Sequence, residues 1–141
     1  MKNFEVLLVD DDAIDRELFI EAIETLGGYT IAEATNGNEA LLYLQQAASL
    51  PQLIILDLNM PVKDGRETLI ELKKDPIFKT IPVCIMSTSS AHFDVQHAYN
   101  EGASLFLVKP LEYKQLIEML TSLLTLFGKH VVYAHLIQAK Q

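Results

Sequence analysis

Polar side chains stand directly after four apolar runs in this sequence. Asp10 and Asp11 follow "EVLLV", Asp57 follows "LIIL", Ser87 follows "IPVCIM" and Lys109 follows "SLFLV". Three carboxylates, a hydroxyl and an ammonium are groups that hold a divalent cation and the oxygens of a phosphoryl group. Whether they act together depends on the elements that carry them.

Apolar runs of strand length alternate with stretches of helical periodicity, which is typical of βαβ units around a parallel sheet. Strands are predicted at 5–10, 30–36, 52–58, 81–87 and 104–109, and helices at 13–28, 37–50, 64–75, 91–102 and 112–128. The run 52–58 is apolar on both faces, as in a central strand, and the more polar 30–36 fits a sheet edge. We therefore predict an α/β fold with a doubly wound, five-stranded parallel sheet.

Ligand crevices of open parallel sheets lie at the carboxyl ends of the strands, where all these polar residues stand. Crowded carboxylates repel one another unless a positive charge lies among them. Carboxylate oxygens suit Mg²⁺, with Mn²⁺ as an alternative, better than Zn²⁺. The four histidines are scattered without ligand spacing. The sequence thus predicts a magnesium site at the acidic residues.

An aspartate beside Mg²⁺ can be a ligand, a base or a nucleophile. Ser87 and Lys109 match the oxygens of a phosphoryl group in transfer, a reaction that needs mostly positioning and charge neutralisation. Asp57 is best interpreted as the attacking carboxylate, which gives an aspartyl phosphate.

Composition narrows the class of protein. The chain has 141 residues, half of them hydrophobic, which fits one domain with a proper core. Its net charge of -8 disfavours direct binding to nucleic acid or to an anionic membrane surface. The lone Cys84 lies in an apolar run and suits a reducing compartment. The apolar run at the amino terminus is too short for a signal peptide, and no apolar run is long enough to span a membrane. We therefore expect a cytoplasmic protein.

Four motifs in this order, "LLVDDD", "LIILDLNMPVKDG", "IPVCIMSTS" and "GASLFLVKP", resemble the receiver domain of two-component response regulators over residues 3–127. The resemblance implies a flavodoxin-like (βα)5 fold with strand order 2-1-3-4-5. It also implies a metal site formed by Asp10, Asp11, Asp57 and the backbone carbonyl of Asn59.

The same resemblance assigns the other roles. Asp57 matches the phosphoacceptor, Lys109 the phosphate-binding lysine, Ser87 the switch hydroxyl and Phe106 the switch aromatic. The family's Lys-Pro bond is typically cis, and Lys109-Pro110 stands in its place, although base rates favour trans. Ser89 and Asn59 flank the expected path of the attacking water, so we expect them to tune the lifetime of the phosphoryl group.

The implied function is a single-domain response regulator. A sensor histidine kinase or phosphotransfer protein would donate the phosphoryl group, and the sequence of residues 75–90 resembles that of regulators that work with phytochrome-type kinases. The chain would catalyse only its own phosphorylation and dephosphorylation, and would signal to a protein target by contact or phosphotransfer. We divide it into a receiver domain, 1–127, and a short extension, 128–141, with no separate effector domain. The extension's apolar centre, Val131 to Ile137, predicts packing or a homodimer contact.

Other interpretations stay open at this point. A haloacid-dehalogenase-like phosphatase also uses an aspartyl phosphate, and Asp10-x-Asp12 superficially matches its opening motif, although Ile14 stands where that motif has Thr or Val. A receiver-shaped module that no longer takes phosphate is the other rival, and a flavin-binding protein fits less well. Asp10 could also cap a helix, for which Asp12 is the better candidate. Gly65 is expected to be a turn residue, where the chain can turn left-handed.

Overall fold

The sheet is the centre of the computed structural model, which describes residues 4–134. Five parallel strands lie in the order β2-β1-β3-β4-β5, as expected. The strands are β1 (Phe4–Val9), β2 (Tyr29–Ala34), β3 (Leu53–Asp57), β4 (Val83–Ser87) and β5 (Leu105–Val108). The helices are α1 (Ala13–Leu26), α2 (Gly37–Gln46), α3 (Gly65–Lys74), α4 (His92–Asn100) and α5 (Tyr113–Lys129), with a short 3₁₀ helix, η1 (Phe78–Thr80).

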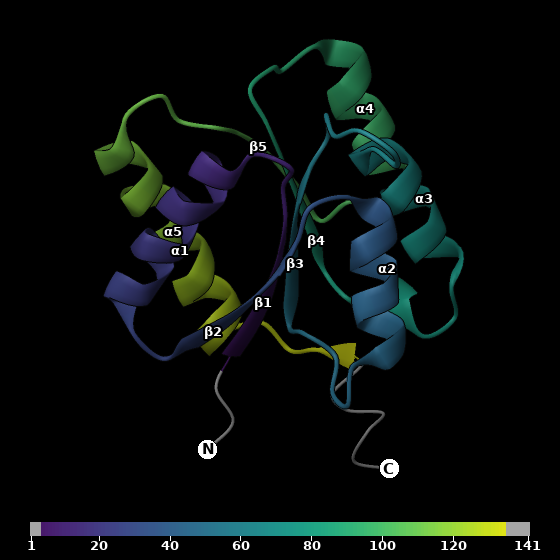
Figure 1. The fold of residues 1–141 in the computed structure, drawn as a ribbon, viewed down its shortest axis with the longest axis horizontal. Coiled ribbons are helices and arrows are strands. Elements are labelled where there is room, and N and C mark those ends of the chain that lie inside the picture. Colours follow the sequence, from purple (N-terminus) through teal and green to yellow (C-terminus); the bar gives the residue numbers. More distant parts are fainter. Residues whose placement is uncertain (1–3, 135–141) are drawn as a thin grey trace.

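Helices cover both faces of the sheet (Figure 1). One core lies under α1 and α5 and takes Val6 and Leu8 from β1 and Leu53 and Ile55 from β3. The alternate residues of the same strands join the other core, under α2, α3 and α4. Because successive side chains of a strand point to opposite faces, the strands need apolar residues at every position. The fully buried β3 and β4 show this, and β4 contains the buried Cys84.

Side-chain caps start three helices, and the cap of α1 is the one that the sequence predicts. Asp12 caps α1 by accepting from the backbone N–H of Ile14 and Asp15, so the cap is Asp12 and not Asp10. Asn36 caps α2 and Asp64 caps α3 in the same way. These caps satisfy backbone donors that a helix start leaves unpaired, and they fix where each loop from the sheet ends.

The i, i+4 spacing of the apolar residues Ile14, Leu18, Ala22 and Leu26 predicts that they form the buried face of α1, and the structure differs from this. Phe19, Ala22 and Ile23 are buried, whereas Ile14 is 69% exposed and Leu18 also faces solvent. The i, i+4 row from Ile14 drifts around the helix, because four residues turn it by more than one full turn. Its first turn therefore exposes the apolar side chain of Ile14.

Helix α5 ends at Lys129, and the chain then folds back under the sheet. Tyr133 is buried, donates a hydrogen bond to the Phe127 carbonyl and lies edge-on to the ring of Phe4. Residues 128–134 thus contribute to the core beneath β1. The rest of the predicted apolar centre, residues 135–137, lies outside the described residues.

Within residues 4–134, none of the helices has the length and apolar character needed to cross a bilayer.

Candidate functional site

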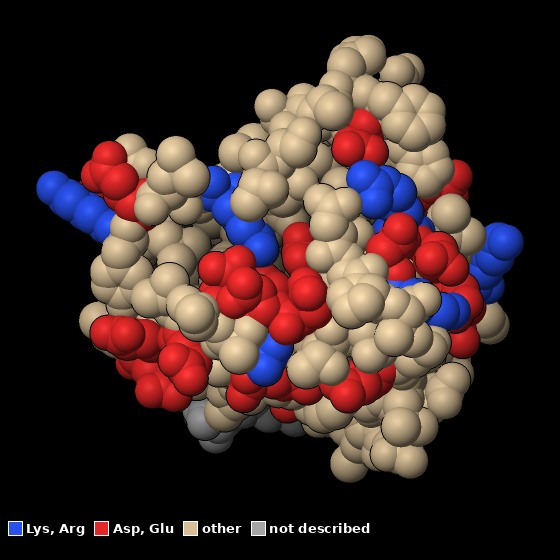
Figure 2. All heavy atoms as spheres, turned by 45° about the horizontal axis from the view of Figure 1, so that its top comes forward, with Lys and Arg blue, Asp and Glu red and all other residues tan. Residues whose placement is uncertain are grey.

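The polar residues that follow β1, β3, β4 and β5 all lie at one end of the sheet. Figure 2 views this end and shows acidic side chains gathered near its centre, with basic side chains beside them. Strands β1 and β3 are neighbours, and the register pairs Val9 with Leu56. Asp10 is therefore level with Asp57, one residue further along each strand.

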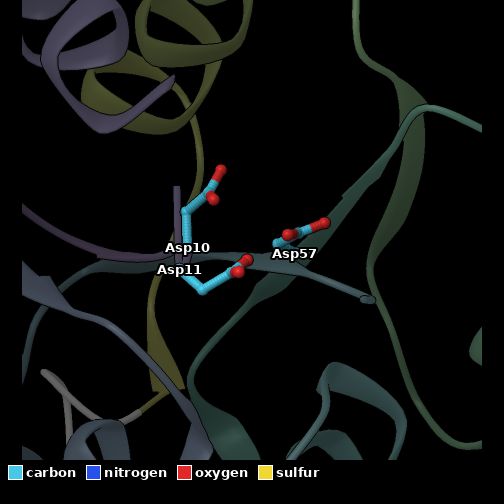
Figure 3. A group of neighbouring side chains, drawn as sticks. All are labelled: Asp10, Asp11 and Asp57. Atoms are coloured by element: carbon cyan, nitrogen blue, oxygen red, sulfur yellow. The ribbon is translucent and has the colours of Figure 1, made fainter. Parts of the chain in front are cut away.

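Asp10, Asp11 and Asp57 form one cluster, in which a carboxylate oxygen from each lies within 4.8 Å of the others. In Figure 3, Asp10 and Asp11 come from the end of β1 and Asp57 from the end of β3. Asp10 and Asp57 are buried and Asp11 is exposed. Such an oxygen-only donor set, open to solvent on one side, fits a hard divalent cation that keeps some of its waters.

Lys109 supplies the positive charge next to this cluster. Its Nζ lies 2.9 Å from Asp10 Oδ2, 3.2 Å from Asp15 Oδ2 and 3.8 Å from Asp57 Oδ1. Burial alone would lower the pKa of Lys109, but its contacts with Asp10, Asp57 and Asp15 outweigh this and raise it. The ammonium therefore stays charged at neutral pH.

Asp57 is an unusual carboxylate. Burial raises its pKa to about 6, helped by the charges of Asp10 and Asp11, whereas Lys109 and the backbone N–H of Asn59 act in the opposite direction. A cation bound in the cluster would favour the ionised form. Asp57 is thus a partly desolvated carboxylate whose ionised form a bound cation would stabilise.

The side chains of Ser87 and Phe106 lie on the face of the sheet opposite to that of Asp57. The alternation of β4 puts Ser87 on the side of Val83 and Ile85, which belong to the core under α4, and Phe106 packs against the same core. Ser87 is buried, and its Oγ accepts a hydrogen bond from the Ser89 N–H at 3.1 Å. Ser87 ends β4, so it lies at the same end of the sheet as Asp57 but on the opposite face.

A model of the response regulator receiver domain matches residues 6–121. The chain belongs to this family. It is 37% identical over 120 residues to response regulator Rcp1 of Synechocystis, and the matched region covers 81% of this chain and 82% of the relative. It is also 35% identical to a probable methanogenesis regulatory protein, FilR2, of Methanothrix harundinacea, covering 80% of this chain and 76% of the relative.

Solved structures agree with the receiver assignment. The phosphorylated cyanobacterial phytochrome response regulator RcpA matches with a TM-score of 0.88 and 33% identity, covering 94% of this chain and 99% of that one. The Mn²⁺-bound form of Rcp1 matches with a TM-score of 0.83 and 33% identity, covering 92% and 98%. The family match rules out the dehalogenase-like and flavin-binding alternatives.

Two details of this receiver differ from the sequence-based expectation. The Lys109-Pro110 peptide bond is trans, since the residues that the structure describes include no cis bond; trans is the default even before proline. Gly65 does not have a positive φ. A Cβ atom there would collide with the backbone oxygen of Asp57 and lie 2.8 Å from Leu58 Cα, so the position needs glycine for close approach.

Three residues near the site carry roles that the sequence reading missed. Asp15 contacts Lys109, and Arg16 donates from Nη1 to the Asp10 carbonyl at 2.8 Å. Asp11 lies before the cap of α1 and Asp15 lies in its first turn, so helical spacing does not place the two on one face.

Arg66 forms a hydrogen bond to Asp94 and reaches the Asn59 side chain, with Arg66 Nη1 lying 3.4 Å from Asn59 Oδ1. The long-range partners of Asp15 and Arg66 have no local sequence signal.

Proposed function

We propose that this receiver is a Mg²⁺-dependent phosphoacceptor switch, with Asp57 as the residue that takes the phosphoryl group. The observation that carries the proposal is the placement of Asp57. Its carboxylate ends a buried strand, shares a cluster with two further carboxylates, and lies 3.8 Å from the Lys109 ammonium. A carboxylate fixed at the end of a buried strand suits a nucleophile that must meet its donor in one orientation.

Asp10, Asp11, Asp57 and the Asn59 backbone carbonyl would hold the metal. Asp10 already accepts from the Asp12 N–H at Oδ1 and from Lys109 at Oδ2, so Asp11 and Asp57 offer the less occupied oxygens. When bound, Mg²⁺ neutralises charge on the phosphoryl oxygens. Mn²⁺ would fit the same donors, and the Mn²⁺-bound form of Rcp1 supports this.

In the transfer step, a carboxylate oxygen of Asp57 attacks the phosphorus of a phosphohistidine. The new P–O bond forms as the P–N bond breaks, and the imidazole leaves with the electron pair of that bond and takes a proton. Lys109 pairs with the phosphoryl oxygens, since its ammonium already faces Asp57. Water later hydrolyses the acyl phosphate and restores the carboxylate.

The switch would pass from Asp57 to the opposite face of the sheet. Ser87 can donate its hydroxyl hydrogen to the phosphoryl group, and Phe106 would turn into the space that Ser87 leaves. Phe106 packs against the core under α4, and Ser87 is buried, so their movement would change the surface of α4, β5 and α5. Such a bond exists in only one state, which is what a population shift requires. Apart from this self-modification, we propose no enzymatic activity.

A sensor histidine kinase or phosphotransfer protein is the proposed donor, and a downstream protein is the proposed target. The likeness to the phytochrome response regulator RcpA favours a phytochrome-type kinase. A cytoplasmic setting suits the buried, unpaired Cys84 thiol.

The test is the intact mass after incubation with Mg²⁺ and acetyl phosphate. We expect a gain of one phosphoryl group that is lost in Asp57→Ala and when EDTA removes the metal. A folded, Mg²⁺-binding protein that gains no mass would contradict the proposal and favour a phosphate-independent module. Continuous release of phosphate from a monoester at high turnover would contradict the assignment as a self-modifying switch.

A further inference from the structure

The Lys109 ammonium is shared between the acidic cluster and a carboxylate outside it. Its hydrogen bonds go to Asp10 and Asp15, and Asp57 at 3.8 Å is beyond hydrogen-bond distance. Asp15 stands in the first turn of α1, outside the three-carboxylate cluster. Its side chain is 39% exposed, whereas Lys109 is 11% exposed. A partly exposed carboxylate therefore binds a nearly buried cation that makes no hydrogen bond to Asp57.

We propose that Asp15 is a positioning residue that competes with the phosphoryl group for Lys109 and so weakens the hold of the site on that group. This inference rests on the proposed phosphoacceptor function. It assigns to α1 a contribution that neither the sequence motifs nor the metal cluster contains.

The competition follows from charge and from donor geometry. An ammonium has three N–H donors, and two of them point to Asp10 and Asp15 in this structure. A phosphorylated Asp57 would carry more negative charge than a carboxylate and accept through three oxygens. Lys109 would then move toward Asp57, and the contact with the exposed Asp15 is the easier one to give up. Asp15 therefore stabilises the unphosphorylated state selectively.

The loop before α1 keeps Asp15 in place for this role. Asp12 accepts from the Asp15 N–H at 3.0 Å, and Arg16 binds the Asp10 carbonyl and the Glu33 side chain. The first turn of α1 is thus fastened on both sides of Asp15. The backbone of Asp15 is therefore held where its carboxylate accepts the hydrogen bond from Lys109.

The experiment compares Asp15→Asn with Asp15→Glu and with Glu17→Gln. Glu17 is an exposed acid on the same helix, and two residues of separation turn it away from Asp15. The probe is beryllofluoride, a phosphoryl mimic, titrated in saturating Mg²⁺. Mg²⁺ alone is titrated separately, since a general charge effect would change both affinities.

We expect Asp15→Asn to tighten beryllofluoride binding about 5-fold, the scale of one partly exposed ion pair, with Mg²⁺ affinity changed less than about 2-fold. Asp15→Glu should remain near the parent, and Glu17→Gln should change neither affinity by more than about 2-fold. Unchanged or weaker beryllofluoride binding in Asp15→Asn would overturn the proposal, as would an equal effect of Glu17→Gln. Failure of the parent protein to bind beryllofluoride or accept a phosphoryl group would overturn the proposed function itself.

Discussion

Arg66 joins α3 to α4 through Asp94, with Nη2 and Nε lying 2.9 and 3.2 Å from the same carboxylate oxygen. The same guanidinium reaches the side chain of Asn59, two residues after Asp57. One side chain therefore touches both the loop at the site and the first turn of α4, the helix that follows β4 in the chain.

We expect Arg66 and Asp94 to be energetically coupled. Both side chains are partly exposed, so a double-mutant cycle of Arg66→Ala and Asp94→Ala should give a coupling of about 0.5–1 kcal/mol in urea unfolding. Arg66→Ala should also change the half-life of the aspartyl phosphate more than Asp94→Ala does, because only Arg66 contacts Asn59. Equal half-lives in the two single variants would show that Asn59 does not respond to this contact.

Metal-free protein should gain stability from Asp57→Asn at neutral pH. The folded pKa of about 6, against 3.8 ordinarily, means that ionised Asp57 destabilises the fold. The free energy of unfolding therefore falls as pH rises from about 4 to 6 and Asp57 ionises, and above about pH 6 the full loss of stability remains. Removing it should add up to about 3 kcal/mol at pH 7.5, with a smaller gain near pH 4. Urea unfolding at both pH values in EDTA measures this.

Two controls sharpen that prediction. Asp11→Asn removes an exposed carboxylate of the same cluster and should stabilise less. Added Mg²⁺ should stabilise the parent more than Asp57→Asn, since it binds the folded state of the parent more tightly. A loss of stability in metal-free Asp57→Asn at pH 7.5 would mean that the carboxylate is well accommodated without a cation.

Gly65→Ala should damage the site. Its Cβ would collide with the backbone of Asp57 and Leu58, and such overpacking typically costs about 1–3 kcal/mol. We expect a lower Tm together with slower phosphorylation by acetyl phosphate. Gly128→Ala is the matched control, because a Cβ there would contact the Tyr29 hydroxyl at an ordinary 3.4 Å within α5. It should be neutral or stabilise by about 0.5–1 kcal/mol. Equal losses in both variants would contradict the steric argument.

Ser87→Ala should separate phosphorylation from switching. We expect the variant to accept the phosphoryl group at Asp57, because Ser87 is not the nucleophile, but to lose the change in the environment of Phe106 that phosphorylation causes. Aromatic NMR signals recorded with and without beryllofluoride report this, with Ser87→Thr as the variant that keeps the hydroxyl. A full Phe106 response in Ser87→Ala would rule out the hydroxyl as the link.

The segment after residue 127 should be needed for full stability. A chain cut after residue 127 loses the end of α5 and the buried Tyr133 with its contact to Phe4, whereas a chain cut after residue 134 keeps them. We expect the shorter chain to be less stable by about 3 kcal/mol or more, the scale of an aromatic removed from a core. Thermal unfolding measures this, and light scattering on the two cut chains and the full chain tests a dimer contact. Equal Tm values would confine the folded unit to residues 1–127.

The fold could be predicted because its central strands are apolar on both faces and its apolar runs alternate with helical periodicity. Asp12 and the run before Asp57 are local signals of this kind. The positions of the polar residues at strand ends were predictable for the same reason. Contacts such as Lys109 with Asp15 or Arg66 with Asp94 join residues far apart in sequence, and only the assembled fold brings them together. The requirement for Gly65 likewise arises from a backbone that crosses it at close range.

The buried Cys84 is a built-in probe of how often the sheet opens. It is the sole cysteine of the chain, burial raises its pKa to about 12, and it lies three residues before Ser87, paired in register with Leu105 of the edge strand β5. A thiol reagent can reach it only when β4 is uncovered, so the labelling rate measures how often this part of the protein opens. Comparing that rate with and without beryllofluoride would read the rigidity of the sheet beneath the site, without any introduced label.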